Sequence, residues 1–245
     1  MDHAFFQPGV PTVVIHAVLD AGARDQYVVV QTTTGSLNQQ KEVAGAEVVI
    51  TTPDGRALRA DEIRDTLVYT TMRFITPQVG VVYRVSLDKY GVSLVGGGTY
   101  SLHVQLPDGR EVAGHTTIPP APQSPPINSS ITFDRSRDTL RLAWPASAGT
   151  RVYEVFVSSS RSVFTTFADT SIALPGTAQT SAGSFAFIPG ATSQLVVSAV
   201  DDNYYDYYRR GSDPFSGGGI ETHLVGGIGL FGSIVPVARR TLIVR

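Results

Sequence analysis

Short segments in which hydrophobic and polar residues alternate recur along the chain, separated by glycine, proline, asparagine and aspartate. In the first half these segments are rich in β-branched residues and bounded by turn residues, which is typical of strands. We expect strands in residues 10–19, 26–34, 46–55, 80–87 and 98–118. Residues 59–74 fit no single pattern, and a helical turn and a variable loop are equally consistent with them. The pattern predicts an all-β protein.

The segment 98–118 allows the most detailed local prediction. Pro107 and Asp108 suit the centre of a type I turn, and Gly109 can take the left-handed position of a three-residue hairpin loop. This register sets Val104 opposite Val112. The inner face then holds Leu102 and Leu106, and the outer face holds Ser101, His103, Gln105, Glu111, Ala113 and His115.

The second half shows the same alternation in "DTLRLAWPAS", "RVYEVFVSS" and "SQLVVSAVDD". The expected inward residues are Leu140, Leu142, Trp144, Tyr153, Val155, Val157, Leu195, Val197 and Ala199. Five prolines in "IPPAPQSPPINSS" mark the boundary between the halves, because proline cannot donate to a sheet ladder. We therefore expect two tandem β-sandwich domains over residues 1–122 and 123–245, each of the size of an immunoglobulin-like sandwich.

Composition excludes several classes of function. The 245 residues are 42% hydrophobic and 16% charged, and the net charge of −2 offers no field to attract nucleic acid. Cysteine is absent, which removes disulfides, zinc-thiolate sites and cysteine nucleophiles. The sequence has no apolar stretch of 18 residues, and "MDHAFFQPGVPTVV" lacks the pattern of a secretory signal. The chain is thus expected to be cytoplasmic or a mature form.

The chain resembles a family of bacterial envelope lipoproteins in which an immunoglobulin-like half precedes a fibronectin type III-like half. The resemblance lies in "VAGAEVVITTPDGR", "GGTYSLHVQLPDGREVAGHTTIP", "LAWPAS" with "YEVFVSS", and "GGIGLFGSIVPVARRTLIV". It implies a membrane-associated protein in the periplasm or on the cell surface with an accessory role. It supplies no catalytic residues and no cofactor.

The histidines offer little support for catalysis. His16 shares a strand face with Val14 and Val18, so we expect a buried structural histidine. His103 and His115 are diagonal neighbours near Glu111 in the predicted hairpin. These three side chains could hold zinc or copper, but a solvated strand face rarely supplies the supporting contacts that a metal needs. No nucleophile, metalloprotease or phosphate-binding motif is present, and we expect no enzyme activity and no cofactor.

The segment "DDNYYDYYRRGSDPFSGGG" (201–219) is the main candidate site. The first residues of this segment carry side-chain oxygens that could bind calcium, namely those of Asp201, Asp202, Asn203 and Asp206. The alternative is that these residues only mark the end of a strand and the start of a turn. Strand pairing should end near Asp201, which leaves four tyrosines in an irregular connection where not all can turn inward. Three interpretations remain: the rings cover the fibronectin-like core, they dock a protein, or they stack on sugars.

The predicted partner-binding set combines this segment with an apolar pair in the glycine-rich tail. The pair is expected to pack inward or, alternatively, to form an apolar knob. The set is Tyr204, Tyr205, Tyr207, Tyr208, Arg209, Arg210, Phe215, Leu230 and Phe231. The predicted function is a non-catalytic, membrane-extrinsic accessory subunit that stabilises an outer-membrane transporter or a photosynthetic reaction-centre assembly. A carbohydrate-binding surface module is the alternative. Protein subunits are the expected partners, with peripheral membrane contact and a glycan as further candidates.

Overall fold

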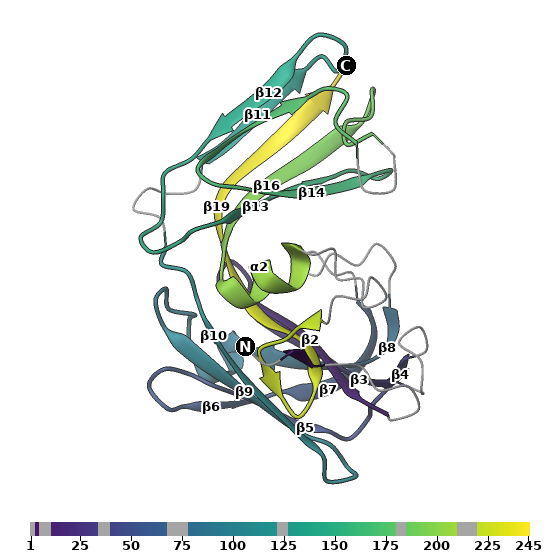
Figure 1. The fold of residues 1–245 in the computed structure, drawn as a ribbon, viewed down its shortest axis with the longest axis vertical. Helices are drawn as coiled ribbons and strands as arrows, with labels where there is room; N and C mark the ends of the chain where they lie inside the picture. The colour runs from purple at the N-terminus through teal and green to yellow at the C-terminus, as the bar shows by residue number, and fades with distance from the viewer. Residues whose placement is uncertain are drawn as a thin grey trace. The chain divides into compact units, whose positions relative to one another are not determined.

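The computed structural model describes residues 3–4, 11–33, 40–67, 78–121, 127–179, 185–209 and 220–245. The chain forms two compact units built from β-sheets (Figure 1). The first unit comprises Met1–Ile118 and Asp201–Ile234, and the second comprises Pro119–Val200 and Val235–Arg245. The predicted all-β sandwich fold is confirmed.

Two larger sheets make up the first unit. One sheet has the strand order β18-β10-β9-β5-β6, and the other runs β19-β2-β3-β8-β7 with β4 beside β3. The strands of the first sheet are β5 (Glu47–Thr51), β6 (Ala57–Arg59), β9 (Thr99–Gln105), β10 (Glu111–Thr117) and β18 (Leu224–Val225). The strands of the second sheet are β2 (Val13–Asp20), β3 (Asp25–Thr33), β4 (Gln40–Glu42), β7 (Asp61–Leu67), β8 (Gln78–Ser86) and β19 (Ile228–Val244). The unit also holds β1 (His3–Ala4), which pairs with β17 (Ile220–Glu221), and the helices α1 (Leu87–Tyr90) and α2 (Asp202–Arg209).

Strand β2 is almost entirely buried. It pairs in parallel with the start of β19 on one side and antiparallel with β3 on the other. Ile15, Ala17 and Leu19 are almost fully buried, and so is His16 on the opposite face. Because both faces of β2 are covered, its sequence is nearly continuously apolar rather than alternating.

The predicted β9–β10 hairpin is confirmed in register and turn. Val104 lies opposite Val112, and the Leu106 amide donates to the Arg110 carbonyl at 2.8 Å to close the loop. Gly109 has a φ of 87°, in the left-handed region that the three-residue loop requires. The inner residues of the hairpin are buried and the outer ones exposed, as the alternation predicts.

The prediction for residues 59–74 is wrong where the structure describes them. Residues 61–67 form strand β7, which pairs antiparallel with β8 from Asp61 opposite Arg84 to Leu67 opposite Gln78. The four charged residues of β7 obscure the alternation from which a strand is predicted. They are tolerated because β7 is the outermost strand of its sheet, and edge strands commonly carry charge. Residues 68–74 lie outside the described part.

The second unit contains a sheet with the order β14-β13-β16-β19, in which β11 pairs in parallel with β19, and a two-stranded sheet of β12 and β15. Its strands are β11 (Ile127–Phe133), β12 (Thr139–Ala143), β13 (Tyr153–Ser158), β14 (Val163–Ala168), β15 (Ser171–Pro175) and β16 (Thr192–Val200). All the predicted inward residues of this half are buried. Trp144 and Tyr153 meet edge to face with ring centroids 5.7 Å apart.

The units differ from the predicted division at 122/123 in one respect. The first continuous stretch ends at Ile118, but residues 201–234, which the sequence places in the second domain, belong to the first unit. The reason is that β19 pairs with strands that are far from it in sequence. It begins beside β2 and continues beside β11, so this one strand contributes to both units.

Candidate functional site

The tyrosine-rich segment forms a helix rather than an irregular connection. Helix α2 begins after Asp201, whose carboxylate Oδ1 accepts a hydrogen bond from the Tyr204 amide at 3.0 Å. The Tyr205 amide donates to the Asp201 carbonyl at 3.1 Å, so Asp201 is the N-cap. A helix sets residues three and four apart on one face, which gathers Tyr204, Tyr207 and Tyr208.

These three of the four rings turn inward, in agreement with the expectation that not all four could do so. Tyr204 is fully buried, and its ring lies 4.7 Å from that of Tyr208. Tyr207 and Tyr208 contact the His16 ring edge-on, with ring centroids 6.0 and 6.3 Å from the centroid of the imidazole. The Tyr208 hydroxyl is 2.9 Å from His16 Nε2. Tyr207 and Tyr208 therefore cover β2 of the first unit.

Burial sets the protonation of this inner face. It lowers the pKa of His16 to about 4, so the imidazole is neutral at pH 7. Burial also raises the pKa of Tyr207, which keeps the phenol protonated. His16 is buried, as the sequence predicts.

Asp201 ties the start of α2 to two strands. Its Oδ2 accepts from the Thr116 hydroxyl of β10 at 2.6 Å, and its Oδ1 accepts from the Ser233 amide of β19 at 2.9 Å. Burial raises the pKa of Asp201 to about 6, while the hydrogen bonds from Thr116, Ser233 and Tyr204 oppose that rise. The carboxylate is thus mostly ionised at pH 7 and held in place by its donors.

Asn203 adds a second link between the helix and the same two strands. Its side-chain amide donates to the carbonyls of His115 and Phe231 at 2.7 and 2.8 Å. Asn203 thus presents its nitrogen, not its oxygen, to these neighbours. The four residues considered for calcium therefore do not converge on one point, and the described residues hold no group of three or more metal-ligating side chains.

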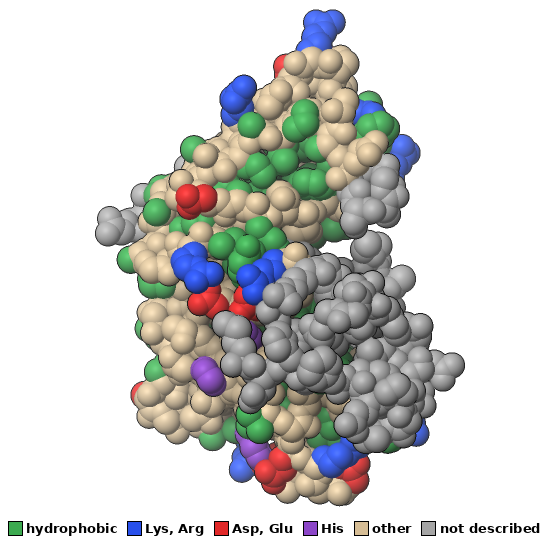
Figure 2. Space-filling model, viewed as in Figure 1, with side chains coloured by type: hydrophobic (Ala, Val, Ile, Leu, Met, Phe, Trp, Pro, Cys, Tyr) green, Lys and Arg blue, Asp and Glu red, His purple; other side chains and the backbone are tan. Residues whose placement is uncertain are grey.

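The opposite, outer face of α2 carries charge and one ring. The Arg209 guanidinium lies 5.5 Å from the centre of the Tyr205 ring. The Asp206 carboxylate lies 3.2 Å from the Arg209 guanidinium. It also lies 3.2 Å from Nε2 of His223, a residue on the segment just before β18. Figure 2 shows basic and acidic side chains side by side in the region of α2. We call Tyr205, Asp206 and Arg209 the outer face of α2.

The remaining members of the predicted set lie elsewhere. Leu230 and Phe231 are on β19 and are 1% and 2% exposed, so they pack inward and the alternative of an apolar knob is wrong. Arg210 and Phe215 lie outside the described residues. The structure therefore brings together four tyrosines and Arg209, of which only Tyr205 and Arg209 lie on the outer face.

The hairpin histidines form a smaller cluster. His103 Nε2 is 3.5 Å from the Glu111 carboxylate, and both side chains are about half exposed. His115 lies opposite Ser101, one diagonal step from His103, on the same exposed face. This arrangement is typical of an exposed cross-strand polar contact rather than of a metal site.

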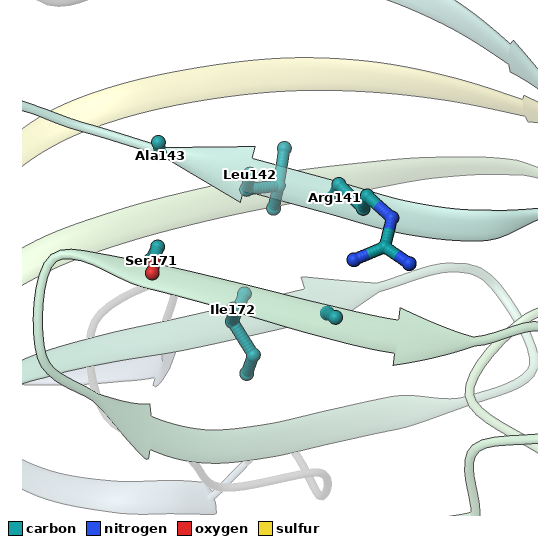
Figure 3. A pocket seen from close by; sticks show the side chains of 6 residues that line it. Arg141, Leu142, Ala143, Ser171 and Ile172 are labelled. Atoms are coloured by element: carbon teal, nitrogen blue, oxygen red, sulfur yellow. The ribbon is translucent and has the colours of Figure 1, made fainter.

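An open depression of about 420 Å³ lies on the two-stranded sheet of the second unit. Arg141 extends from β12 towards β15, and the other labelled side chains are small or apolar (Figure 3). The lining is completed by Leu142, Ala143, Ser171, Ile172 and Ala173. Convergent polar groups, which binding and catalytic sites use to orient a ligand, are missing from this lining.

The sequence interpretation missed the residues that hold the helix: Thr116, Ser233, Asn203 as an amide donor, and His223. A local signal for the helix was present, because an aspartate precedes tyrosines at the third, sixth and seventh following positions. No local signal marks Thr116 or Ser233, which are distant in sequence.

The fold and this site define an all-β protein of two sandwich units in which a short helix is fixed to the sheets of the first. The chain belongs to the family described as "Domain of unknown function (DUF4249)", whose model matches residues 6–235. Among solved structures it is similar to the FN1–FN3 domains of chicken CNTN1, at 12% identity and a TM-score of 0.20, covering 96% of this chain and 68% of that one. A comparison with curated proteins finds no match.

Proposed function

We propose that this chain is a non-catalytic interaction module that docks a protein partner through the outer face of α2. The observation that carries the proposal is the pairing of Tyr205 with Arg209 on that face. Tyrosine and arginine are the side chains most enriched where proteins bind one another, because each joins a wide contact surface to polar groups.

The anchoring of α2 supports the same proposal. Asp201 and Asn203 fix the helix to β10 and β19, and the half-buried Tyr207 and Tyr208 fix it to β2. A surface held in this way loses little conformational entropy when a partner binds, so more of the contact energy appears as affinity.

The proposed partners are protein subunits of a membrane-associated complex outside the cytoplasm. This part rests on the resemblance to envelope lipoproteins, and an outer-membrane transporter is the first choice of complex. Among the described residues, no helix is long and apolar enough to cross a membrane. The proposed role is that of a membrane-extrinsic accessory subunit, as the resemblance implies.

Tyr205 and Tyr90 provide a matched experiment. Tyr90 also lies beside a cation, with Lys89 Nζ 5.6 Å from its ring centre, but it is at the end of α1 and its hydroxyl bonds the Arg59 main chain of β6. Native membranes are solubilised gently and proteins that co-purify with Tyr205→Ala or Tyr90→Ala chains are identified and quantified. We expect Tyr205→Ala to lose a defined complex and Tyr90→Ala to retain it.

Two outcomes contradict the proposal. One is equal retention of the complex by both variants. The other is a loss of glycan retention by Tyr205→Ala while the complex stays intact, which would support the carbohydrate-binding alternative. The position of Arg209 beside the ring favours a protein, because the guanidinium lies near the surface on which a sugar would stack.

A further inference from the structure

Strand β14, one of the outermost strands of the second unit, lacks the features that normally prevent strands from pairing between molecules. Its sequence, VFTTFA, contains no charge and no proline, and every residue is only partly buried. Among the described residues, β13 is the neighbour to which β14 is hydrogen-bonded. Three other outermost strands carry such features, since β7 and β12 contain charged residues and β15 ends in proline.

The hairpin register determines which main-chain groups of β14 point outward. At the turn, the Ser159 amide donates to the Ser162 carbonyl at 2.9 Å, which makes these two residues a hydrogen-bonded pair. Hydrogen-bonded and non-hydrogen-bonded pairs alternate along an antiparallel ladder. The N–H and C=O groups of Val163, Thr165 and Phe167 are therefore directed away from β13.

We propose that this edge pairs antiparallel with the same edge of a second copy of this chain. A two-fold axis at Thr165 sets the residues whose main-chain groups point outward opposite one another over the whole strand. A register shifted by one residue would instead set each of them opposite a residue whose main-chain groups point towards β13. Thr165 then lies opposite Thr165 of the second copy, and Val163 lies opposite Phe167 of the second copy. Threonine pairs and pairs of an aromatic with a β-branched residue are favoured across antiparallel strands.

Charge at the two ends of the strand selects the same register. Arg161 and Asp169 flank β14, and both are exposed. With the axis at Thr165, Arg161 of one copy lies opposite Asp169 of the other, and the symmetry repeats this pair at the opposite end. The cross-strand side-chain pairs, the outward-directed main-chain groups and the flanking charges thus all favour the same symmetric register.

The outer face of the sheet would continue across the pair. Val163 and Phe167 share this face with Phe156 and Val196, which are partly buried residues of β13 and β16. Figure 2 shows hydrophobic side chains at the surface of the region that contains β14 and β16. Pairing of two edges buries less surface than a permanent interface, so the dimer should depend on concentration.

The test is sedimentation velocity of the full chain over a range of concentrations. The wild-type mass should rise from 26.2 kDa towards twice that value as concentration increases. Arg161→Asp and Asp169→Arg each place like charges opposite one another at both ends, so each variant alone should raise the dimer dissociation constant about tenfold. In an equimolar mixture both end pairs are again of opposite charge, and the dimer should reappear.

Arg141→Asp changes an exposed arginine on β12 and serves as the matched control, with an unchanged dissociation constant expected. Circular dichroism and thermal unfolding should show that all variants are folded. The proposal is overturned if the wild-type chain is monomeric at every concentration, which would leave the edge to a strand from another protein. It is also overturned if dimerisation is insensitive to the charge changes or if mixing the two variants restores nothing.

Discussion

Replacing Asp201 by asparagine tests how α2 is held to the first unit. The pKa of Asp201 rises from 3.8 to about 6 in the folded chain because of burial. The folded state therefore binds this proton more tightly, and the resulting stabilisation is present below pH 3.8 and is lost as pH rises through about 6. Between pH 7 and pH 4 this contribution amounts to about 2 kcal/mol.

His16 works in the opposite direction. Its pKa falls from 6.5 to about 4 on folding, so its contribution to stability is present above pH 6.5 and is lost as pH falls towards 4. In the wild-type chain the two effects largely cancel. Relative to wild type, Asp201→Asn should therefore lose about 2 kcal/mol of stability between pH 7 and pH 4. His16→Gln should gain a similar amount relative to wild type.

Hydrogen exchange of the α2 amides in the full chain is the suitable assay, because it reports the opening of this helix rather than unfolding of both units. Exchange at each pH is compared with that of an unstructured peptide. Asp202→Asn, an exposed neighbour at the start of α2, is the control and should show a much smaller pH-dependent difference. A difference between Asp201→Asn and wild type that is the same at pH 7 and pH 4 would refute the reasoning.

Three further variants probe single contacts. Tyr208→Phe removes the hydroxyl bonded to His16 and should lower stability by about 1 kcal/mol, as measured by α2 hydrogen exchange. Gly229→Ala should destabilise the first unit strongly, because Gly229 has a φ of 115° and a Cβ there would collide with the Ile15 carbonyl; thermal unfolding measures the loss. Tyr83→Phe removes a buried hydroxyl that accepts from the Ala46 amide and donates to the Val43 carbonyl, just before β5. The free energy of unfolding measured in urea should fall by about 1–3 kcal/mol, and an unchanged value would count against these contacts.

The sheets were predictable from the sequence where one face is buried and the other exposed. The 98–118 hairpin is such a case, since its alternation and its Gly109 turn together determine register and facing. Strand β7 was not predictable in the same way. Its charged residues suit an outermost strand, and only its pairing with β8 reveals it.

The local structure of the candidate site was not predicted from the sequence. The expectation of an irregular connection at the tyrosine cluster overlooked the N-cap signal of Asp201. The anchors Thr116 and Ser233 come from β10 and β19, which the fold brings to the start of α2 from distant parts of the chain. Contacts of this kind follow from topology, and short sequence patterns do not contain them.

Photo-cross-linking from position 205 tests the proposed docking through α2 most directly. A photoreactive amino acid replaces Tyr205 in the cell that makes the chain, and Tyr90 is replaced in a parallel strain. We predict one discrete cross-linked protein product from position 205, belonging to a membrane-associated complex, and none from position 90. Absence of a product from position 205, or the same products from both positions, would contradict the proposal.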